Sequence, residues 1–204
     1  MNILITGSDG FIGKNLCAHL TALGFDSLLP YDRRTDPKRL EAYAATCDFV
    51  FHLAGINRPS AESDFEENPR FTRELVEALK KGKKKPPVLM SSSVQALLNN
   101  PYGLSKRKAE DILLEYGRDA GVDVYLFRLP GVFGKWCVPN YNSVIATFCH
   151  NISRGLPVRV DDPAAPLTLV FIDDVLRAFT AALLSTTVKR SVFYEVDPVH
   201  RTTV

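Results

Sequence analysis

The sequence has few of the residues on which several protein classes depend. Its four cysteines, Cys17, Cys47, Cys137 and Cys149, lie far apart with no C-x-x-C spacing. A chain of 204 residues does not need disulfides to fold, so free thiols in a reducing cytoplasm are expected. The four histidines are scattered without the spacing of metal ligands. A disulfide scaffold is therefore excluded, and no metal site is expected.

Long apolar runs and a strong net charge are missing as well. Nowhere do about 18 apolar residues follow one another, and residues 1–7 lack the basic start of a signal peptide. The formal charge is only +2, and the lysine-rich run 80–85 follows a helical pattern, which indicates the solvated end of a helix. We therefore expect a cytoplasmic protein with neither a membrane nor a nucleic acid as partner.

Short apolar runs alternate with longer helical patterns along the chain. The strands are expected near residues 3–5, 27–29, 49–53, 88–90 and 122–127, and the helices near 11–23, 39–45, 71–79 and 101–120. Strands that are apolar throughout are typical of a parallel sheet covered on both faces. The sequence thus predicts an α/β fold with a doubly wound, Rossmann-type parallel sheet.

The alternation loosens after Arg128. A helix is expected near residues 143–154, an extended piece near 167–172 and another helix near 173–185, and a new element is expected to start at 202–204. We therefore predict a single domain over residues 1–204, with a cofactor part at about 1–130 and a small, incomplete substrate-binding part at about 131–204. The chain is expected to be a fragment of a longer protein.

A glycine motif directly follows the first predicted strand. Gly7, Gly10 and Gly13 form a G-x-x-G-x-x-G pattern that opens the first helix, where Phe11 and Ile12 supply backbone N–H groups. Glycine allows a sharp turn and the close approach of a pyrophosphate, and the helix N-terminus favours negative charge. The motif predicts a dinucleotide site, although a plain tight turn would produce the same pattern.

Charged residues follow the second predicted strand, where a dinucleotide fold binds the adenosine ribose. Asp32 could accept the ribose 2′-OH of NAD(H), whereas the guanidinium groups of Arg33 and Arg34 would bind the 2′-phosphate of NADP(H). Because two arginines outweigh one repelling carboxylate, NADP(H) is favoured and NAD(H) stays possible. A solvated charged loop is the alternative.

Tyr102 and Lys106 lie four residues apart on a predicted helix, so they share one face. The Lys106 ammonium could lower the phenol pKa of Tyr102 and also reach a cofactor ribose. Residues 91–93 are three serines that end the fourth strand at the carboxyl edge of the sheet, where a serine hydroxyl could polarise a carbonyl group while Tyr102 moves a proton. A serine, Tyr102 and Lys106 at this edge are therefore candidates for catalysis.

With these motifs the chain resembles the extended short-chain dehydrogenase/reductase superfamily, in its nucleotide-sugar branch. The similar segments are residues 7–13, 51–55, 91–93, 102–106, 128–134 and 170–175. The resemblance implies that Ser93, Tyr102 and Lys106 are catalytic. It also implies that the turn Leu53, Ala54 and Gly55 contacts the dinucleotide.

Residues 52–59, 91–96, 100–103 and 133–149 are similar to reductases of capsular polysaccharide synthesis in the UDP-N-acetyl-L-fucosamine pathway. The resemblance implies NADPH-dependent reduction of a UDP-4-keto-6-deoxy-hexosamine to the 6-deoxy-L-talose sugar. It also implies that Asn140, Asn142 and Ser143 bind substrate, although a helix N-cap is the alternative for this loop. The cupin domain of that family is absent from residues 1–204, and its chemistry is not assigned to this chain.

Two other activities remain open on the same fold. A nucleotide-sugar epimerase or dehydratase is one alternative, but a dehydratase usually has Asp-Glu after the catalytic hydroxyl, where this chain has Val94 and Gln95. A non-catalytic dinucleotide sensor is the other, and such modules usually lose the tyrosine or the lysine. Relatives also form dimers through two long helices, so a homodimer is expected, with contacts from Leu113, Leu114 and Tyr116 unless these face the chain's own core.

Overall fold

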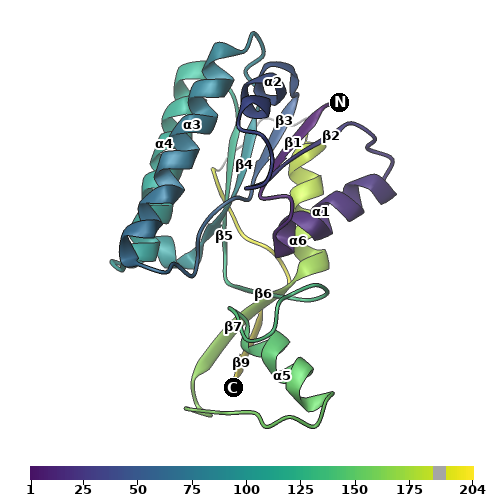
Figure 1. Cartoon of the computed structure of the whole chain (residues 1–204), viewed down its shortest axis with the longest axis vertical. Coiled ribbons are helices and arrows are strands. Elements are labelled where there is room, and N and C mark those ends of the chain that lie inside the picture. The colour runs from purple at the N-terminus through teal and green to yellow at the C-terminus, as the bar shows by residue number, and fades with distance from the viewer. Residues whose placement is uncertain (186–191) are drawn as a thin grey trace.

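The computed structural model describes residues 1–185 and 192–204 of the chain. Its centre is a six-stranded sheet in the order β2-β1-β3-β4-β5-β8, in which every neighbouring pair is parallel. The strands are β1 (Ile3–Thr6), β2 (Leu28–Tyr31), β3 (Phe49–His52), β4 (Val88–Ser93), β5 (Val124–Leu129) and β8 (Phe193–Tyr194). The predicted α/β fold with a parallel sheet is confirmed (Figure 1).

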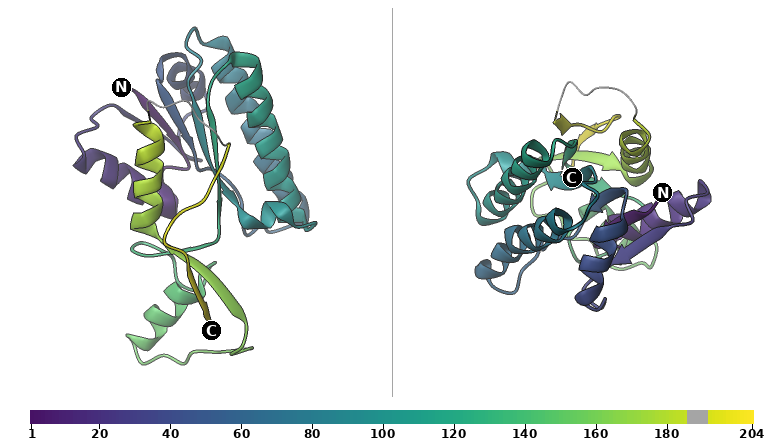
Figure 2. Two further views of the ribbon diagram at one scale, coloured as in Figure 1. Left: turned by 180° about the vertical axis from the view of Figure 1, so that it is seen from behind. Right: turned by 90° about the horizontal axis from the view of Figure 1, so that it is seen from above.

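Helices cover both faces of this sheet. On one face lie α1 (Phe11–Ala22) and α6 (Ile172–Leu183), and on the other lie α2 (Lys38–Thr46), α3 (Glu67–Lys81) and α4 (Pro101–Ala120), as Figures 1 and 2 show. Successive side chains of a strand point to opposite faces, so Ile3 and Ile5 join the core with α1 and α6, while Leu4 joins the other core. A strand buried on both faces must be apolar throughout.

Both ends of α4 are specified by local chemistry. At its start, the side-chain Oδ1 of Asn100 accepts a hydrogen bond from the Gly103 N–H at 2.8 Å, and Pro101 occupies the first turn. At its end, Gly121 takes a left-handed φ of 65°, which glycine adopts without steric cost. The helix predicted at residues 101–120 is therefore confirmed at both ends.

A smaller unit is built on a second sheet. It contains β6 (Gly131–Phe133), β7 (Pro166–Phe171) and β9 (His200–Thr203), with β6 parallel and β9 antiparallel to β7, together with helix α5 (Val144–Ile152). Between β7 and β9 the chain returns to the large sheet to form α6 and β8 (Figure 1). Residues 131–204 thus contribute to both units, and the smaller unit is not one continuous segment.

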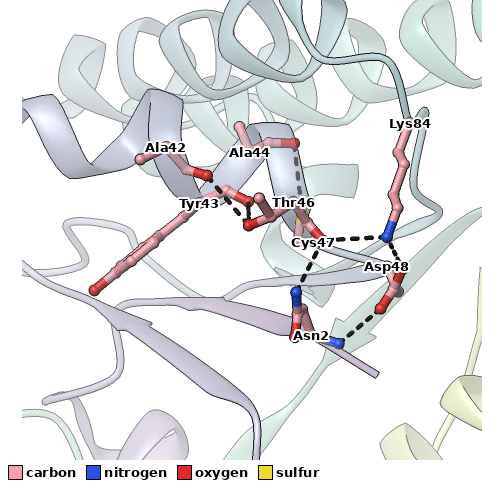
Figure 3. Close-up of polar contacts among 8 residues, drawn as sticks. All are labelled: Asn2, Ala42, Tyr43, Ala44, Thr46, Cys47, Asp48 and Lys84. Carbon is pink, nitrogen blue, oxygen red and sulfur yellow. Dashed lines mark hydrogen bonds and ion pairs between the residues drawn. The ribbon is translucent and has the colours of Figure 1, made fainter.

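Polar contacts join the amino ends of two central strands, far from the carboxyl edge of the sheet. Asp48, just before β3, accepts hydrogen bonds from the Lys84 Nζ at 2.6 Å and the Asn2 backbone N–H at 2.7 Å (Figure 3). These two donors hold the pKa of Asp48 below its ordinary value, with Lys84 the larger cause. Lys80, in the last turn of α3, pairs with Asp119 at 3.3 Å. The lysine run therefore forms a helix end with local acidic partners, as predicted.

Two of the three side chains predicted for a dimer interface lie in the chain's own core. Leu113 and Tyr116 are fully buried, and the Tyr116 hydroxyl donates to the Pro86 carbonyl at 3.0 Å. Leu114 is half-buried and packs against the same core. The expected contribution of Leu113 and Tyr116 to a dimer is wrong, because the sheet itself occupies their faces of α4.

Among the described residues, no helix combines the length and apolarity needed to cross a membrane.

Candidate active site

The glycine motif forms a tight cradle at the carboxyl end of β1. Gly7 takes a left-handed φ of 72°, and a Cβ atom there would lie 2.7 Å from the backbone nitrogen of Ala54. A Cβ atom on Gly13 would lie 2.2 Å from the Gly7 carbonyl oxygen. Backbone segments can approach this closely only without side chains at these two positions. The first and third glycines of the motif are thus required by the fold itself.

The N-terminus of α1 opens toward this cradle. Gly10 is its N-cap residue, no side chain caps the helix, and its first turn carries no acidic residue. The N–H groups of Phe11 and Ile12 therefore have no intrahelical acceptor, and the helix dipole adds positive potential. These features fit the pyrophosphate of a dinucleotide, as the sequence predicts for these residues. The assignment of individual residues to the cofactor remains a prediction.

A buried histidine, His52, lies at the carboxyl end of β3, the strand next to β1. His52 Nδ1 is 2.9 Å from Thr6 Oγ1, and its Nε2 is 2.9 Å from Thr72 Oγ1. Thr72 donates its own proton to the Asn68 carbonyl at 2.8 Å, so it must accept from His52 Nε2. Nδ1 is then the acceptor for the Thr6 hydroxyl. Burial, followed by the charge of Lys106, lowers the pKa of His52 to about 3, so the imidazole is neutral.

This histidine network fixes the predicted cofactor turn at Leu53, Ala54 and Gly55. Thr6 Oγ1 also accepts from the Ala54 N–H at 3.3 Å, and the Leu53 N–H donates to the Thr6 carbonyl at 3.1 Å. The turn therefore lies against the glycine cradle at Gly7. A rigid turn at this edge suits the binding of a planar base or a ribose, as the predicted role of the turn requires.

The charged residues after β2 are partly engaged with one another. Arg34 Nη2 lies 3.0 Å from the Asp9 carboxylate, and its Nε lies 3.8 Å from Asp32. Asp9 also pairs with Lys14 at 3.2 Å. Arg33 is exposed and has no ion pair with any residue that the structure describes. The three predicted residues Asp32, Arg33 and Arg34 thus lie together beside the glycine cradle, with one free guanidinium group.

Ser93 and Tyr102 meet at the carboxyl edge of the large sheet. The Ser93 hydroxyl lies close enough to Tyr102 to act on its pKa, and Ser93 Oγ accepts a hydrogen bond from the Gln95 N–H at 3.2 Å. Burial raises the pKa of Tyr102, and the Ser93 hydroxyl opposes part of this rise. The Phe65 ring packs on Tyr102 with centroids 5.6 Å apart. The phenol is therefore protonated at neutral pH and stands next to a hydroxyl, as expected of a proton donor and its partner.

Lys106 is buried beside the same edge. Its Nζ donates to the Ser91 carbonyl at 3.0 Å and lies 3.1 Å from the place that a Cβ atom on Gly55 would take. Burial lowers the pKa of Lys106 to about 8, while the charge of Glu110 opposes the change. The expectation that this ammonium lowers the phenol pKa is wrong here, because Tyr102 is raised overall and Ser93 alone lowers it. Lys106 instead faces the predicted cofactor turn.

Asn68 joins these parts, and the sequence analysis missed it. Its Nδ2 donates to Ser105 Oγ and to the Ile56 carbonyl, both at 3.0 Å, and its Oδ1 accepts from the Ile56 N–H at 2.7 Å. Ser105 Oγ in turn donates to the Tyr102 carbonyl at 2.8 Å. Asn68 thus holds the end of the cofactor turn against α4. The helix was predicted only near residues 71–79, so Asn68 lay outside every expected element.

The predicted substrate loop lies apart from Ser93 and Tyr102. Ser143 Oγ accepts from the Ala146 N–H at 3.2 Å and caps α5, so the alternative given for this loop is confirmed at that residue. Asn142 is exposed, and Asn140 takes a left-handed φ of 55°. The backbone carbonyl groups of residues 140 and 141 accept from Arg58, which follows the cofactor turn. The loop therefore touches the rim of the site, and its role with substrate remains a prediction.

One open cavity of about 590 Å³ lies beside the glycine cradle. It is lined by Ser8, Lys14, Cys17 and Trp136 and so excludes Ser93, Tyr102 and Lys106. Within the described residues, no group of three or more His, Cys, Asp or Glu side chains is placed to hold a metal ion.

Comparison with known proteins agrees with this geometry. The NAD dependent epimerase/dehydratase family matches residues 3–193. A curated relative from Pseudomonas aeruginosa, UDP-2-acetamido-2,6-beta-L-arabino-hexul-4-ose reductase, is 44% identical over all of this chain and 55% of its own length. A D-erythronate dehydrogenase from Haemophilus influenzae is 26% identical over 82% of this chain and 65% of its own length. The chain thus spans 55% of the length of the first relative and 65% of the length of the second.

Solved structures show the same arrangement. The capsular polysaccharide assembling protein CapF from Staphylococcus aureus superimposes with a TM-score of 0.88 at 39% identity, over all of this chain and 54% of that one. The dTDP-glucose 4,6-dehydratase DesIV from Streptomyces venezuelae, solved with NAD bound, superimposes with a TM-score of 0.84 at 21% identity, over all of this chain and 77% of that one. The second likeness is one of fold alone.

Proposed function

The chain belongs to the NAD dependent epimerase/dehydratase family, and from this membership we propose that it is a nucleotide-sugar 4-keto reductase. Its substrate is a UDP-4-keto-6-deoxy-N-acetyl-hexosamine and its product the 6-deoxy-L-talose sugar, in the synthesis of surface polysaccharide precursors. The observation that carries the proposal is the placement of the Ser93 hydroxyl next to the Tyr102 phenol at the sheet edge, in a chain aligned throughout with a relative named as a hexul-4-ose reductase.

The chain's own residues account for the proton side of such a reduction. The bound dinucleotide supplies the hydride that C4 of the sugar receives. Ser93 holds the C4 oxygen by a hydrogen bond, and Tyr102 gives its proton to that oxygen as negative charge develops. A raised pKa keeps Tyr102 protonated until then. Lys106, cationic below about pH 8, stands at the turn where a ribose hydroxyl would lie.

Residues beyond Ser93 argue against a dehydratase. Val94 and Gln95 start the short helix η2 (Val94–Leu97), and neither side chain can act as an acid or base. The Gln95 Oε1 accepts a hydrogen bond from Asn100 at 3.3 Å, and the Gln95 N–H donates to Ser93 Oγ. Gln95 therefore holds the Ser93 side chain and the start of α4 in place. A sensor that binds the dinucleotide without turnover is the second candidate, and it has no need of a paired serine and tyrosine.

We propose NADP(H) as the cofactor, with NAD(H) as the alternative, on the strength of Arg33 and Arg34 beside the glycine cradle. The proposed setting is the cytoplasm, which four free cysteines support. Asn140, Asn142 and Ser143 are proposed to line the sugar side of the site, and Arg58 already bridges their loop to the cofactor turn.

Tyr102→Phe tests the proposed reaction. The variant removes the proton donor but keeps the ring, so turnover of a 4-keto UDP-sugar should fall by about 10²- to 10⁴-fold, the usual contribution of general acid catalysis. NADPH affinity and thermal stability should stay close to wild type, because the phenyl ring still packs on Phe65. The measurement is the rate of NADPH consumption, followed by the absorbance of the reduced cofactor.

Two outcomes would oppose the proposal. Wild-type turnover in Tyr102→Phe would mean that another group gives the proton. NADPH binding by calorimetry without any oxidation by the keto sugar would favour the sensor.

A further inference from the structure

The proposed mechanism leaves one buried charged residue of α4 unused. Glu110 is only 1% exposed and lies four residues after Lys106, on the same face of the helix. A carboxylate in the interior is costly unless every oxygen is paired. The partners of Glu110 therefore decide what it can do.

Both oxygens of Glu110 are occupied. Arg128 donates from Nε to Oε1 at 3.0 Å and from Nη2 to Oε2 at 2.6 Å, which is a bidentate pair. Ser92 Oγ donates to Oε1 at 2.5 Å. On the far side, the Arg128 guanidinium stacks on the Phe193 ring at 4.0 Å from its centroid. The carboxylate is thus held in one orientation by three hydrogen bonds.

These contacts connect the elements that carry the catalytic residues. Ser92 and Arg128 are paired across β4 and β5, so one carboxylate of α4 binds both strands at the same level. Ser92 directly precedes Ser93, and Glu110 lies two turns after Tyr102 on α4. The position of the helix relative to the strand end, and with it the placement of Tyr102 next to Ser93, is therefore set by this network.

Charge adds a second effect. Lys106 lies among neutral groups: the imidazole of His52 from β3, the Ser91 carbonyl from β4 and the backbone of Gly55. Among the described residues, Glu110 is the carboxylate that raises the pKa of Lys106 against burial, and the positive charge of Arg128 lies beyond it. A buried ion pair is weak evidence for stability alone.

We propose that Glu110 is a positioning residue for the reductase reaction, which fixes α4 to the end of β4 through Ser92 and Arg128 and maintains the cation at Lys106. The proposal rests on the proposed function. It assigns to Glu110 no contact with substrate, since its carboxylate is fully occupied inside the molecule.

Glu110→Gln is the central variant. It keeps the size of the side chain but removes its charge, so kcat should fall by about tenfold, while KM for the keto sugar and the affinity for NADPH change by less than about threefold. The titration of Lys106, followed by ¹³C NMR at its Cε without substrate, should move to lower pH by about one pH unit. Ser92→Ala should lower kcat but leave that titration in place, because it removes a contact and no charge.

The matched control is Asp119→Asn, because Asp119 lies on the same helix as Glu110. This variant breaks the exposed pair with Lys80 of α3 and should change neither kcat nor the titration of Lys106. If Glu110→Gln does not fold, Glu110→Asp must lower kcat with a near wild-type titration, because it keeps the charge but not the reach. Wild-type kcat in folded Glu110→Gln, or an unmoved Lys106 titration, would overturn the proposal. Wild-type protein without turnover would instead overturn the proposed function, which the NMR titration does not require.

Discussion

Arg33 and Arg34 differ in how free they are to bind a phosphate. Arg34 is already bonded to Asp9 and Asp32, whereas Arg33 is exposed and unpaired among the described residues. A phosphate would have to compete with two carboxylates for Arg34, but for Arg33 only with water. The preference for NADP(H), if these residues cause it, therefore depends more on Arg33.

Arg33→Ala should reduce the preference for NADPH over NADH by at least about tenfold, since a charge-assisted hydrogen bond contributes about 1.5–3 kcal/mol. Replacing both arginines by alanine should remove most of the preference and leave Asp9 and Asp32 facing the ribose. Calorimetry with the two reduced cofactors measures the ratio directly. Equal affinities in the wild-type chain would show that the loop is only a solvated surface.

His52 makes the stability of the fold depend on pH. Its pKa is about 3 in the folded chain, against about 6.5 in an unfolded one, so the unfolded state takes up the proton first. His52 should therefore not reduce the free energy of unfolding above about pH 7. Below that pH the free energy of unfolding should decrease, by up to about 1.4 kcal/mol per pH unit, until about pH 3. His52→Gln should flatten this slope in urea unfolding between about pH 5 and 7, where carboxylates are mostly ionised. An unchanged slope would mean that other groups dominate.

At the scale of single elements, α4 depends on its first turn because it carries Tyr102 and Lys106. Asn100→Ala removes the acceptor of the Gly103 N–H, and the loss of such a cap costs about 1 kcal/mol. For a chain of this size we expect a decrease in Tm of about 2–4 °C by calorimetry. Asn100→Asp, which keeps an acceptor at the helix N-terminus, should stay near wild type. A loss equal to that of alanine would assign the effect to the Asn100–Gln95 contact instead.

The elements that sequence patterns predicted best are those with local causes. Helix α4 has a cap and a terminal glycine in its own sequence, and its bounds agree with the prediction. The apolar run of strand β4 covers only residues 88–90, and the strand extends to Ser93, where the serine motif had placed its end. Strand β8, which has two residues, was missed, and where β9 lies only an element of unspecified type was expected near 202–204; both form strands by pairing with distant strands.

The site follows the same division. The glycine cradle, Ser93 and Tyr102 come from motifs with fixed spacing, and the structure brings the last two into contact. The roles of Asn68 and Glu110 could not be read from spacing, because their partners lie on other elements. The pKa of Tyr102 was also mispredicted, since burial is a property of the assembled fold.

At the scale of the whole molecule, dimer formation stays a prediction, but the structure changes the kind of contacts that we expect at the interface. The outward side chains of α3 and α4 include Arg73, Glu74, Glu77, Lys108 and Asp111, all exposed. An interface through these faces would depend on charge pairs, which salt screens. We expect a dimer by light scattering at low ionic strength and micromolar concentration, with a shift toward monomer at about 1 M salt. A monomer under both conditions would count against the dimer.

The return of the chain from β7 to α6 limits how the two units can move. Among the described residues, the backbone passes between them after β5, again between β7 and α6, and once more between β8 and β9. Units joined by one linker can swing freely, but units joined by several neighbouring passages can only rock about the line that the passages form. A single cut in the backbone between the units would leave them still threaded together. The smaller unit is therefore expected to move relative to the large sheet by bending and not as an independent body.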